Sequence, residues 1–308
     1  MSDDAFSHQS VLLQESIDAL VTKTDGFYID ATYGRGGHSR YLLKQLDSKA
    51  KLWVFDKDPL AIANAQDLAR QDERVTVFNQ SFSLIKEALH SHDQTRKVDG
   101  LLCDFGVSSP QLDDAKRGFS FLKDGPLDMR MNPDEGQSVA EFLASAAQDH
   151  ISEILFQYGE ESQARKIAKA IKNTSEPLTT TSQLAQLIQQ VKGTNPAQRK
   201  HPATQSFQAL RIYINKELED ISKLCKDLDY ILAPKGALVA ISFHSLEDKI
   251  IKKVVQGDQT LLRDLPFAPE HHVTFGYRIK KCLANDVELA HNVRARSAIM
   301  RVIERRSV

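Results

Sequence analysis

The strongest constraint on the fold is a regular alternation of short β-rich runs and longer amphipathic stretches between residues 26 and 104. Strands are expected at residues 27–30, 52–56, 75–79 and 98–104. The intervening stretches repeat apolar residues at i, i+3 and i+4, which predicts helices at residues 39–46, 59–70 and 84–91. Strands that alternate with such helices are typical of βαβ units, which build a parallel sheet. The sequence therefore predicts an α/β fold.

This alternation stops after Asp104, and for roughly a hundred residues no strand pattern occurs, which is far too long for a βα loop. Helical patterns occupy this stretch at residues 138–147, 150–172 and 181–192. The parent pattern then resumes with a long helix at 205–232, a strand at 237–242, a helix at 246–256 and strands at 273–277 and 298–304. We therefore expect a discontinuous domain of residues 1–110 and 206–308, with residues 111–205 as an inserted all-helical domain.

Composition limits the class of protein. The 308 residues are 41% hydrophobic and 26% charged, as in ordinary globular proteins. The acidic, polar start fits neither a secretory signal nor a transit peptide, and no run of 18 apolar residues occurs. We therefore expect a cytoplasmic protein that binds no membrane. Its three widely spaced cysteines should be reduced thiols, and no metal site is expected.

The charge is close to balanced but unevenly placed. A net charge of −1 argues against a protein that coats nucleic acid by long-range attraction. The last fifteen residues nevertheless hold five arginines, among them Arg294 and Arg296, against the single acid Glu304. This run can serve as a local surface for a phosphate backbone or form a solvated face without function.

A glycine-rich turn follows the first strand and opens the first helix. Residues 30–38 read DATYGRGGH, with Gly34, Gly36, Gly37 and His38 at the edge where such sheets bind ligands. The N–H groups there favour an anionic group, either a dinucleotide pyrophosphate or the carboxylate of an amino-acid-like cofactor. A purely structural tight turn is the alternative.

Carboxylates around this turn separate the cofactor classes. Asp56 ends the second strand, 22 residues after Gly34, where it can accept hydrogen bonds from ribose hydroxyls. Ser39 replaces the third glycine of the dinucleotide fingerprint, and Asp30 precedes the loop. A carboxylate there suits the cationic S-adenosylmethionine better than a pyrophosphate, unless Asp30 only stabilises the loop.

Asp104 ends the fourth strand, where a methyl-accepting group would have to lie. Amine methylation is an in-line displacement at the sulfonium methyl, so the enzyme mainly holds nitrogen, carbon and sulfur collinear. A cytosine amine is a weak nucleophile, and a hydrogen-bond acceptor that pulls on its N–H would help. Asp104 is the leading candidate for this catalytic role, and contact with the cofactor is the alternative.

Several sequence blocks, in order and nearly end to end, resemble the bacterial 16S ribosomal RNA cytosine-N4 methyltransferases of the small-subunit methyltransferase H family. They are HQSVLLQE (8–15), DATYGRGGHS (30–39), DFGVSSPQLD (104–113), RGFSF (117–121), DGPLDMRM (124–131), ISFHSLED (241–248) and RARSA (294–298). The resemblance implies a Rossmann-like methyltransferase sheet with a helical insertion, S-adenosylmethionine as methyl donor, and a cytidine in the decoding region of 16S RNA as acceptor.

Carried over residue by residue, the resemblance implies a set of cofactor contacts: Gly36, Gly37, His38, Asp56, Phe82, Asp104 and Gln111. It also implies candidate substrate contacts: His8, Ser108, Ser109, His244, Arg294 and Arg296. On physical grounds alone, Phe82 would be a core residue and the histidines would be capping or core groups. The helical insertion is the candidate RNA-recognition domain.

Two other classes of protein remain as alternatives. One is an NAD-dependent dehydrogenase, which the missing third glycine disfavours. The other is a non-enzymatic RNA-binding or ribosome-assembly factor that retains the fold, against which the intact carboxylates argue. The acceptor atom rests on the resemblance alone, and the sequence leaves open whether free RNA or the small ribosomal subunit is the substrate. It is also compatible with a homodimer.

Overall fold

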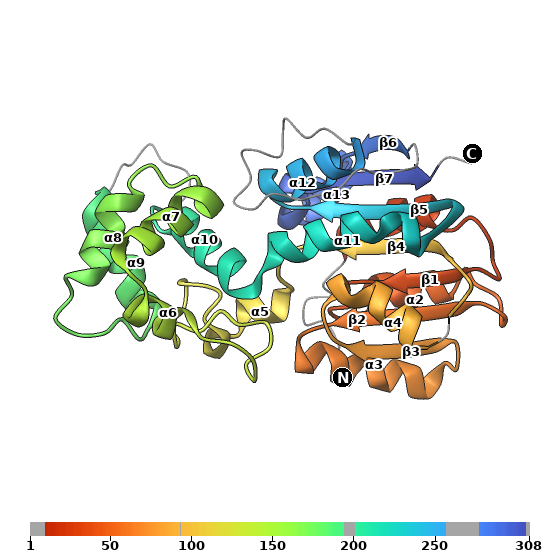
Figure 1. Ribbon diagram of the computed structural model, residues 1–308, viewed down its shortest axis with the longest axis horizontal. Coiled ribbons are helices and arrows are strands. Elements are labelled where there is room, and N and C mark those ends of the chain that lie inside the picture. Colours follow the sequence, from red (N-terminus) through yellow and green to blue (C-terminus); the bar gives the residue numbers. More distant parts are fainter. Residues whose placement is uncertain (1–9, 93, 194–200, 257–276, 306–308) are drawn as a thin grey trace. The chain divides into compact units, whose positions relative to one another are not determined.

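The computed structural model describes residues 10–92, 94–193, 201–256 and 277–305 (Figure 1). The chain divides into two compact units. The first contains Met1–Gly106 and Leu218–Val308, and the second contains Val107–Glu217. The assignment of catalysis to residues 1–110 and 206–308, and of RNA recognition to 111–205, stays a prediction.

The first unit is built on one seven-stranded sheet with the order β3-β2-β1-β4-β5-β7-β6. Pairing is parallel from β3 to β5, and β7 runs antiparallel to both β5 and β6. The strands are β1 (Phe27–Asp30), β2 (Lys51–Asp56), β3 (Val75–Asn79), β4 (Val98–Asp104), β5 (Leu232–Ser242), β6 (Tyr277–Cys282) and β7 (Ile299–Arg305). The expected α/β class with a Rossmann-like sheet is confirmed.

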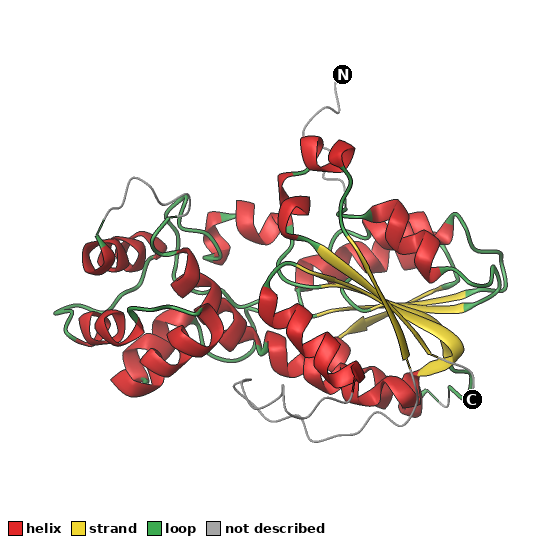
Figure 2. Cartoon of the chain, turned by 90° about the horizontal axis from the view of Figure 1, so that it is seen from above, coloured by secondary structure: helices red, strands yellow, loops and turns green. Residues whose placement is uncertain are grey.

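Helices cover both faces of this twisted sheet (Figure 2). They are α1 (Leu13–Leu20), α2 (Gly37–Leu43), α3 (Pro59–Gln71), α4 (Ile85–Ser91), α11 (Glu217–Ile231), α12 (Ser245–Gln256) and α13 (Asp286–His291). All four residues of β1 are buried, as expected for a central strand with helices on both faces. Asp58 caps α3, because its Oδ1 accepts the Leu60 N–H at 2.9 Å, which leaves Asp56 outside that cap.

The second unit is helical over its described residues, where the only β-type pairing is an isolated bridge between Pro126 and Thr180. Its helices are α5 (Ser109–Asp113), α6 (Val139–Ser145), α7 (Gln148–Gly159), α8 (Ala164–Lys172), α9 (Thr181–Lys192) and α10 (Thr204–Asn215). Contacts of α7 with α8 and α10, and of α8 with α9, build this unit.

Two expected helices are wrong, because each of them is two separate helices in the structure. The pattern at 150–172 forms α7 and α8, which are separated at Glu160 with φ 51°. The pattern at 205–232 forms α10 and α11, which are separated at Lys216 with φ 54°. Left-handed caps of this kind are usually glycine, so a glutamate and a lysine gave no sequence signal.

Two expected strands differ from the described strands by more than one residue at their start. β5 starts five residues before the expected Ala237, and the left-handed Lys235 (φ 65°) lies inside it. Its pairing with β4 shifts register at this point, which is the behaviour of a β-bulge. The strand expected at 273–277 lies mostly outside the described residues, and the described strand β6 begins at Tyr277. Among the described helices, none is both long and apolar enough to span a membrane.

Candidate active site

Three of the predicted carboxylates end neighbouring strands of the sheet. Asp30 ends β1, Asp56 ends β2 and Asp104 ends β4. Because β1 pairs in parallel with both β2 and β4, all three residues lie at one carboxyl edge. This is the edge at which open α/β sheets bind their ligands.

Asp56 organises the glycine-rich turn. Its Oδ2 accepts the Gly34 N–H at 2.8 Å, and its Oδ1 accepts the Asp58 N–H at 2.9 Å. Gly34 has φ 55°, and a Cβ placed there would meet no atom within 4 Å. The turn therefore presents open space beside its backbone. Burial raises the pKa of Asp56, against the hydrogen bonds that lower it.

Asp30 is 1% exposed and receives two donors from its own loop. The Ser39 hydroxyl donates to Oδ2 at 2.5 Å, and the Thr32 N–H donates to Oδ1 at 3.2 Å. Burial raises the pKa of Asp30 to about 6 despite these bonds. Ser39, at the position of the missing third glycine, thus holds the carboxylate, and both Asp30 oxygens serve the loop.

Asp104 is the most perturbed of the three carboxylates. Its N–H donates to the Thr32 hydroxyl at 2.6 Å, whereas its Oδ1 has no hydrogen-bond partner among the described residues. Burial raises the pKa of Asp104 to about 8, the charges of Asp30 and Glu247 add to this, and Arg294 opposes it. A polar atom left without a partner in this way is typical of a ligand site.

His38 is not a counter-ion for Asp104. Its Nδ1 lies 4.0 Å from Asp104 Oδ2, but burial lowers the pKa of His38 to about 4, so the ring is neutral at pH 7. Its Nε2 lies 3.2 Å from the Val11 carbonyl oxygen, which can only accept, so this nitrogen carries the proton. Neighbouring Gly36 caps α2 with φ 71°, and Gly37 is the first residue of that helix.

The other predicted site residues of the first unit lie in several different elements. Phe82 begins a 3-10 helix, is half-buried and packs against Phe105 with ring centroids 5.8 Å apart. Arg294 lies within electrostatic reach of Asp104, because it affects the pKa of that carboxyl, whereas Arg296 is exposed. His244 follows β5 and is described below. His8 lies outside the described residues.

Ser108, Ser109 and Gln111 belong to the second unit, where they form the start of α5. The Gln111 Oε1 accepts the Ser108 N–H at 2.9 Å, and the Ser108 hydroxyl receives the Gln111 N–H, which completes a capping box. Ser109 and Gln111 are buried. Within its own unit, Gln111 therefore has a structural role.

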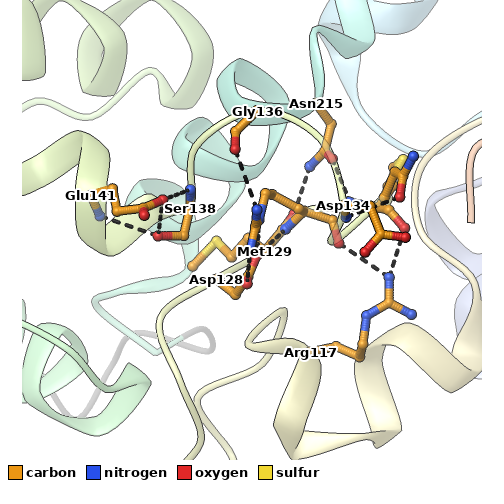
Figure 3. A network of polar contacts seen from close by, with 11 residues as sticks. Arg117, Asp128, Met129, Asp134, Gly136, Ser138, Glu141 and Asn215 are labelled. Carbon is orange, nitrogen blue, oxygen red and sulfur yellow. Dashed lines mark hydrogen bonds and ion pairs between the residues drawn. The ribbon is translucent and has the colours of Figure 1, made fainter.

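The DGPLDMRM block of the second unit forms a tightly held loop that the sequence did not explain (Figure 3). Met129 is fully buried with φ 63°, which is unfavourable for a side chain of its size. The Asn215 amide donates to Met129 O and accepts from Met131 N, each at 2.7 Å. Arg117 donates to the carbonyls of Arg130 and Met131. Strain held from several sides is typical of functional segments.

Sequence reasoning also missed Glu247, the third residue of α12, which is fully buried. Its Oε2 accepts the N–H groups of Phe243 at 2.7 Å and His244 at 3.2 Å. The signal was present, because a glutamate three residues after a helix cap is the spacing of a capping box.

Comparisons with known proteins place the chain in a family. The sequence profile of the MraW methylase family matches residues 5–306. Ribosomal RNA small subunit methyltransferase H of Acinetobacter baumannii is 47% identical over 305 residues, which cover 97% of this chain and 98% of that protein.

Solved structures resemble the chain more distantly. A candidate rRNA methylase from Clostridium thermocellum has 12% identity and a TM-score of 0.43, covering 97% of this chain and 100% of that one. A candidate methyltransferase from Streptococcus mutans in complex with SAH has 13% identity and a TM-score of 0.40, covering 96% and 98%. The family assignment rests on the sequence matches.

Proposed function

The chain belongs to the MraW methylase family, and from that premise we propose that it methylates the N4 amine of a cytidine in the decoding region of 16S ribosomal RNA. Membership confirms the expected methyltransferase class and S-adenosylmethionine as methyl donor, and it excludes the dehydrogenase alternative. The name of the A. baumannii relative supports a small-subunit RNA substrate. A ribosomal substrate also agrees with the expected cytoplasmic location.

The observation that carries the proposal is the group of carboxylates with raised pKa values around a glycine-rich turn that is open at Gly34. Carboxylates whose pKa values are raised by desolvation favour a cationic ligand, since its charge stabilises their ionised form. S-adenosylmethionine has a sulfonium and an ammonium group, and when bound it supplies the electrophilic methyl group. The residues present therefore fit this donor.

We assign the donor contacts by position. The backbone of Gly34, Gly36, Gly37 and His38 would receive the amino-acid end of the donor. Asp56 would accept hydrogen bonds from ribose hydroxyls, and the half-buried ring of Phe82 would flank the adenine. Asp30 would act through the loop it stabilises. Gln111 stays a predicted contact of S-adenosylmethionine, because the resemblance implies it.

Asp104 is the proposed catalytic group. Its Oδ1 is buried and has no hydrogen-bond partner among the described residues, so it is available to an N–H of the acceptor amine. Contact with S-adenosylmethionine is the alternative role of Asp104. His244 and Arg294, which belong to the same unit, are proposed to line the base pocket. His8, Ser108, Ser109 and Arg296 stay predicted substrate contacts on the resemblance.

The second unit is the proposed RNA-recognition domain. The buried residues of α8 lie on one face, whereas Arg165, Lys166, Lys169 and Lys172 are exposed. Basic side chains on an exposed helical face bind phosphate without regard to base sequence. Sequence-specific RNA binding also requires an unstacked base, which the Asp104 site would receive.

The test is transfer of labelled methyl from S-adenosylmethionine to small ribosomal subunits that lack the native modification. Nuclease digestion and mass analysis of the nucleosides then identify the product. We expect N4-methylcytidine with the wild-type protein and no product with Asp104→Ala. Near-normal turnover in that variant would contradict both roles proposed for Asp104.

The same assay separates the alternatives. Donor binding without transfer to subunits, but with transfer to free 16S RNA, would move the substrate from the assembled particle to RNA alone. Binding to either RNA form without any transfer would favour a non-enzymatic assembly factor. A methylated nucleoside other than N4-methylcytidine would overturn the acceptor assignment.

A further inference from the structure

The ISFHSLED block places a half-buried histidine and a buried glutamate directly after β5. Glu247 Oε2 is committed to the backbone, since it accepts the N–H groups of Phe243 and His244. Its other oxygen, Oε1, lies 3.1 Å from His244 Nε2. This distance is within ion-pair range, although the pair is not aligned as a hydrogen bond. One carboxylate therefore caps α12 and contacts the histidine ring.

The contact has a consequence for the proton on His244. A carboxylate can only accept, so it favours the imidazole tautomer with the proton on Nε2. In that tautomer Nδ1 carries a lone pair. The His244 side chain is 10% exposed, and Nδ1 is buried with no hydrogen-bond partner among the described residues. A buried acceptor without a donor is costly unless a ligand supplies one.

The position of this pair relates it to Asp104. β4 and β5 are parallel neighbours, with Asp104 opposite Ile241, so His244 follows three residues beyond that register point at the same carboxyl edge. The charge of Glu247 contributes to the raised pKa of Asp104, which places the glutamate within electrostatic reach of it. Asp104 Oδ1 is itself buried without a hydrogen-bond partner among the described residues.

We propose that Glu247 is a positioning residue for methyl transfer, which holds His244 with Nδ1 as a hydrogen-bond acceptor for the methyl-accepting amine. This inference rests on the proposed function. An exocyclic amine has two N–H groups, and Asp104 and His244 offer one acceptor to each. Holding both N–H groups aims the nitrogen lone pair out of the plane of the base, toward the donor methyl.

The chemical step balances with these groups. The nitrogen lone pair forms the new C–N bond while the C–S bond breaks and its electron pair remains on sulfur. Asp104, ionised beside the positive charge of the bound donor, then takes one proton from the nitrogen. His244 takes no proton in this step and keeps the second N–H oriented. Glu247 takes no proton: it orients His244, and its charge also contributes to the raised pKa of Asp104.

The first test is Glu247→Gln. The glutamine oxygen can still accept from the two backbone N–H groups, but its amide N–H₂ would face His244 Nε2 and reverse the tautomer. We expect kcat to fall by about 10- to 100-fold, with KM for S-adenosylmethionine unchanged. Glu141→Gln is the matched control, because Glu141 also accepts the N–H of its helix cap, Ser138. This control should keep wild-type kcat.

The tautomer itself can be measured without substrate. The ¹⁵N shifts of the imidazole nitrogens distinguish Nδ1–H from Nε2–H, and loss of a signal in His244→Ala assigns it among the 10 histidines. We expect Nε2–H in the wild type and Nδ1–H in Glu247→Gln. A wild-type Nδ1–H signal would overturn the inference. If the tautomers are those expected while no cytidine is methylated, the proposed function fails, whereas the positioning of His244 by Glu247 is supported.

A second pair of variants leaves Glu247 in place. His244→Asn keeps a polar atom near the position of Nδ1, whereas His244→Gln keeps one near Nε2. We expect the asparagine variant to retain the higher kcat. The double variant His244→Ala with Glu247→Gln should be no slower than His244→Ala alone. Additive losses would mean that Glu247 acts independently of His244 and would overturn the inference. Equal activity of the asparagine and glutamine variants would exclude the Nδ1 contact.

Discussion

At the scale of single residues, the Asp104 carboxylate proposed for function lowers the stability of the folded chain when it is ionised. Burial raises the pKa of Asp104 to about 8 from a usual value of 3.8. The folded chain therefore binds a proton at this carboxyl that the unfolded chain releases. The resulting contribution to stability is present in full below the unfolded-state pKa, declines from pH about 4 upward, and is lost as the pH rises through about 8. The ligand-free protein should thus be less stable near neutral pH because of its proposed catalytic group.

We predict that Asp104→Asn is more stable than the wild type at pH 8 and differs little at pH 5, while methyl transfer is lost. One pKa unit corresponds to about 1.4 kcal/mol, and the side chain is 26% exposed, so solvent screening reduces the effect to on the order of 2 kcal/mol. Thermal and urea unfolding at the two pH values measure it.

The control is Asp72→Asn, at a carboxyl whose pKa is lowered rather than raised. Hydrogen bonding to the Arg74 side chain lowers the pKa of Asp72, so removing its charge should not stabilise the protein at pH 8. A loss of stability at pH 8 in Asp104→Asn would contradict the cost assigned to the buried charge.

At the scale of elements, the sequence predicts the strands better than the breaks between helices. Residues 27–30, 75–79 and 98–104 form strands with the expected bounds, because parallel strands are short β-rich runs with sharp ends. The breaks at Glu160 and Lys216 could not be predicted, since neither residue type marks a left-handed cap.

Some features of the candidate site could likewise be predicted from the sequence, and others could not. Asp30, Asp56 and Asp104 could be predicted as neighbours, because each ends a strand and the carboxyl ends of parallel strands share an edge. The raised pKa of Asp104 could not, since it depends on burial and on Glu247, which is distant in sequence. The bonds between Asn215 and the Met129 loop likewise join residues 84 and 86 positions apart.

We predict that Asn215→Ala loosens the Met129 loop. The variant loses a donor to Met129 O and an acceptor for Met131 N, and it leaves a strained residue without its main constraint. The free energy of unfolding should fall by about 2–4 kcal/mol, measured by denaturant titration. Asn173→Ala, at an exposed position after α8, should change it by less than about 0.5 kcal/mol. Equal effects of the two substitutions would contradict the role of Asn215.

At the scale of the whole molecule, the chain combines a sheet whose carboxyl edge is the proposed catalytic site and a helical unit with an exposed basic face. If α8 contacts the RNA backbone, Lys166→Glu with Lys169→Glu should raise KM for the RNA substrate by about tenfold or more and flatten its salt dependence. The affinity for S-adenosylmethionine, measured by calorimetry, should not change.

Lys44→Glu with Lys49→Glu makes the same change in charge at exposed positions of the first unit. This control should leave KM for RNA near the wild-type value. Similar losses in both double variants would indicate that total charge, rather than the α8 face, governs RNA binding.

The insertion also has a consequence for synthesis on the ribosome. β5 lies beside β4 in the sheet, yet it begins about 130 residues after β4 ends, because the second unit intervenes. At about 5–20 residues per second, translation leaves the β4 edge without its partner for roughly 6–26 seconds. This edge is apolar and β-rich, the kind of surface on which nascent chains aggregate. From the order of strands we therefore expect the newborn chain to need chaperones, and faster synthesis of the helical unit to shorten the exposure of this edge.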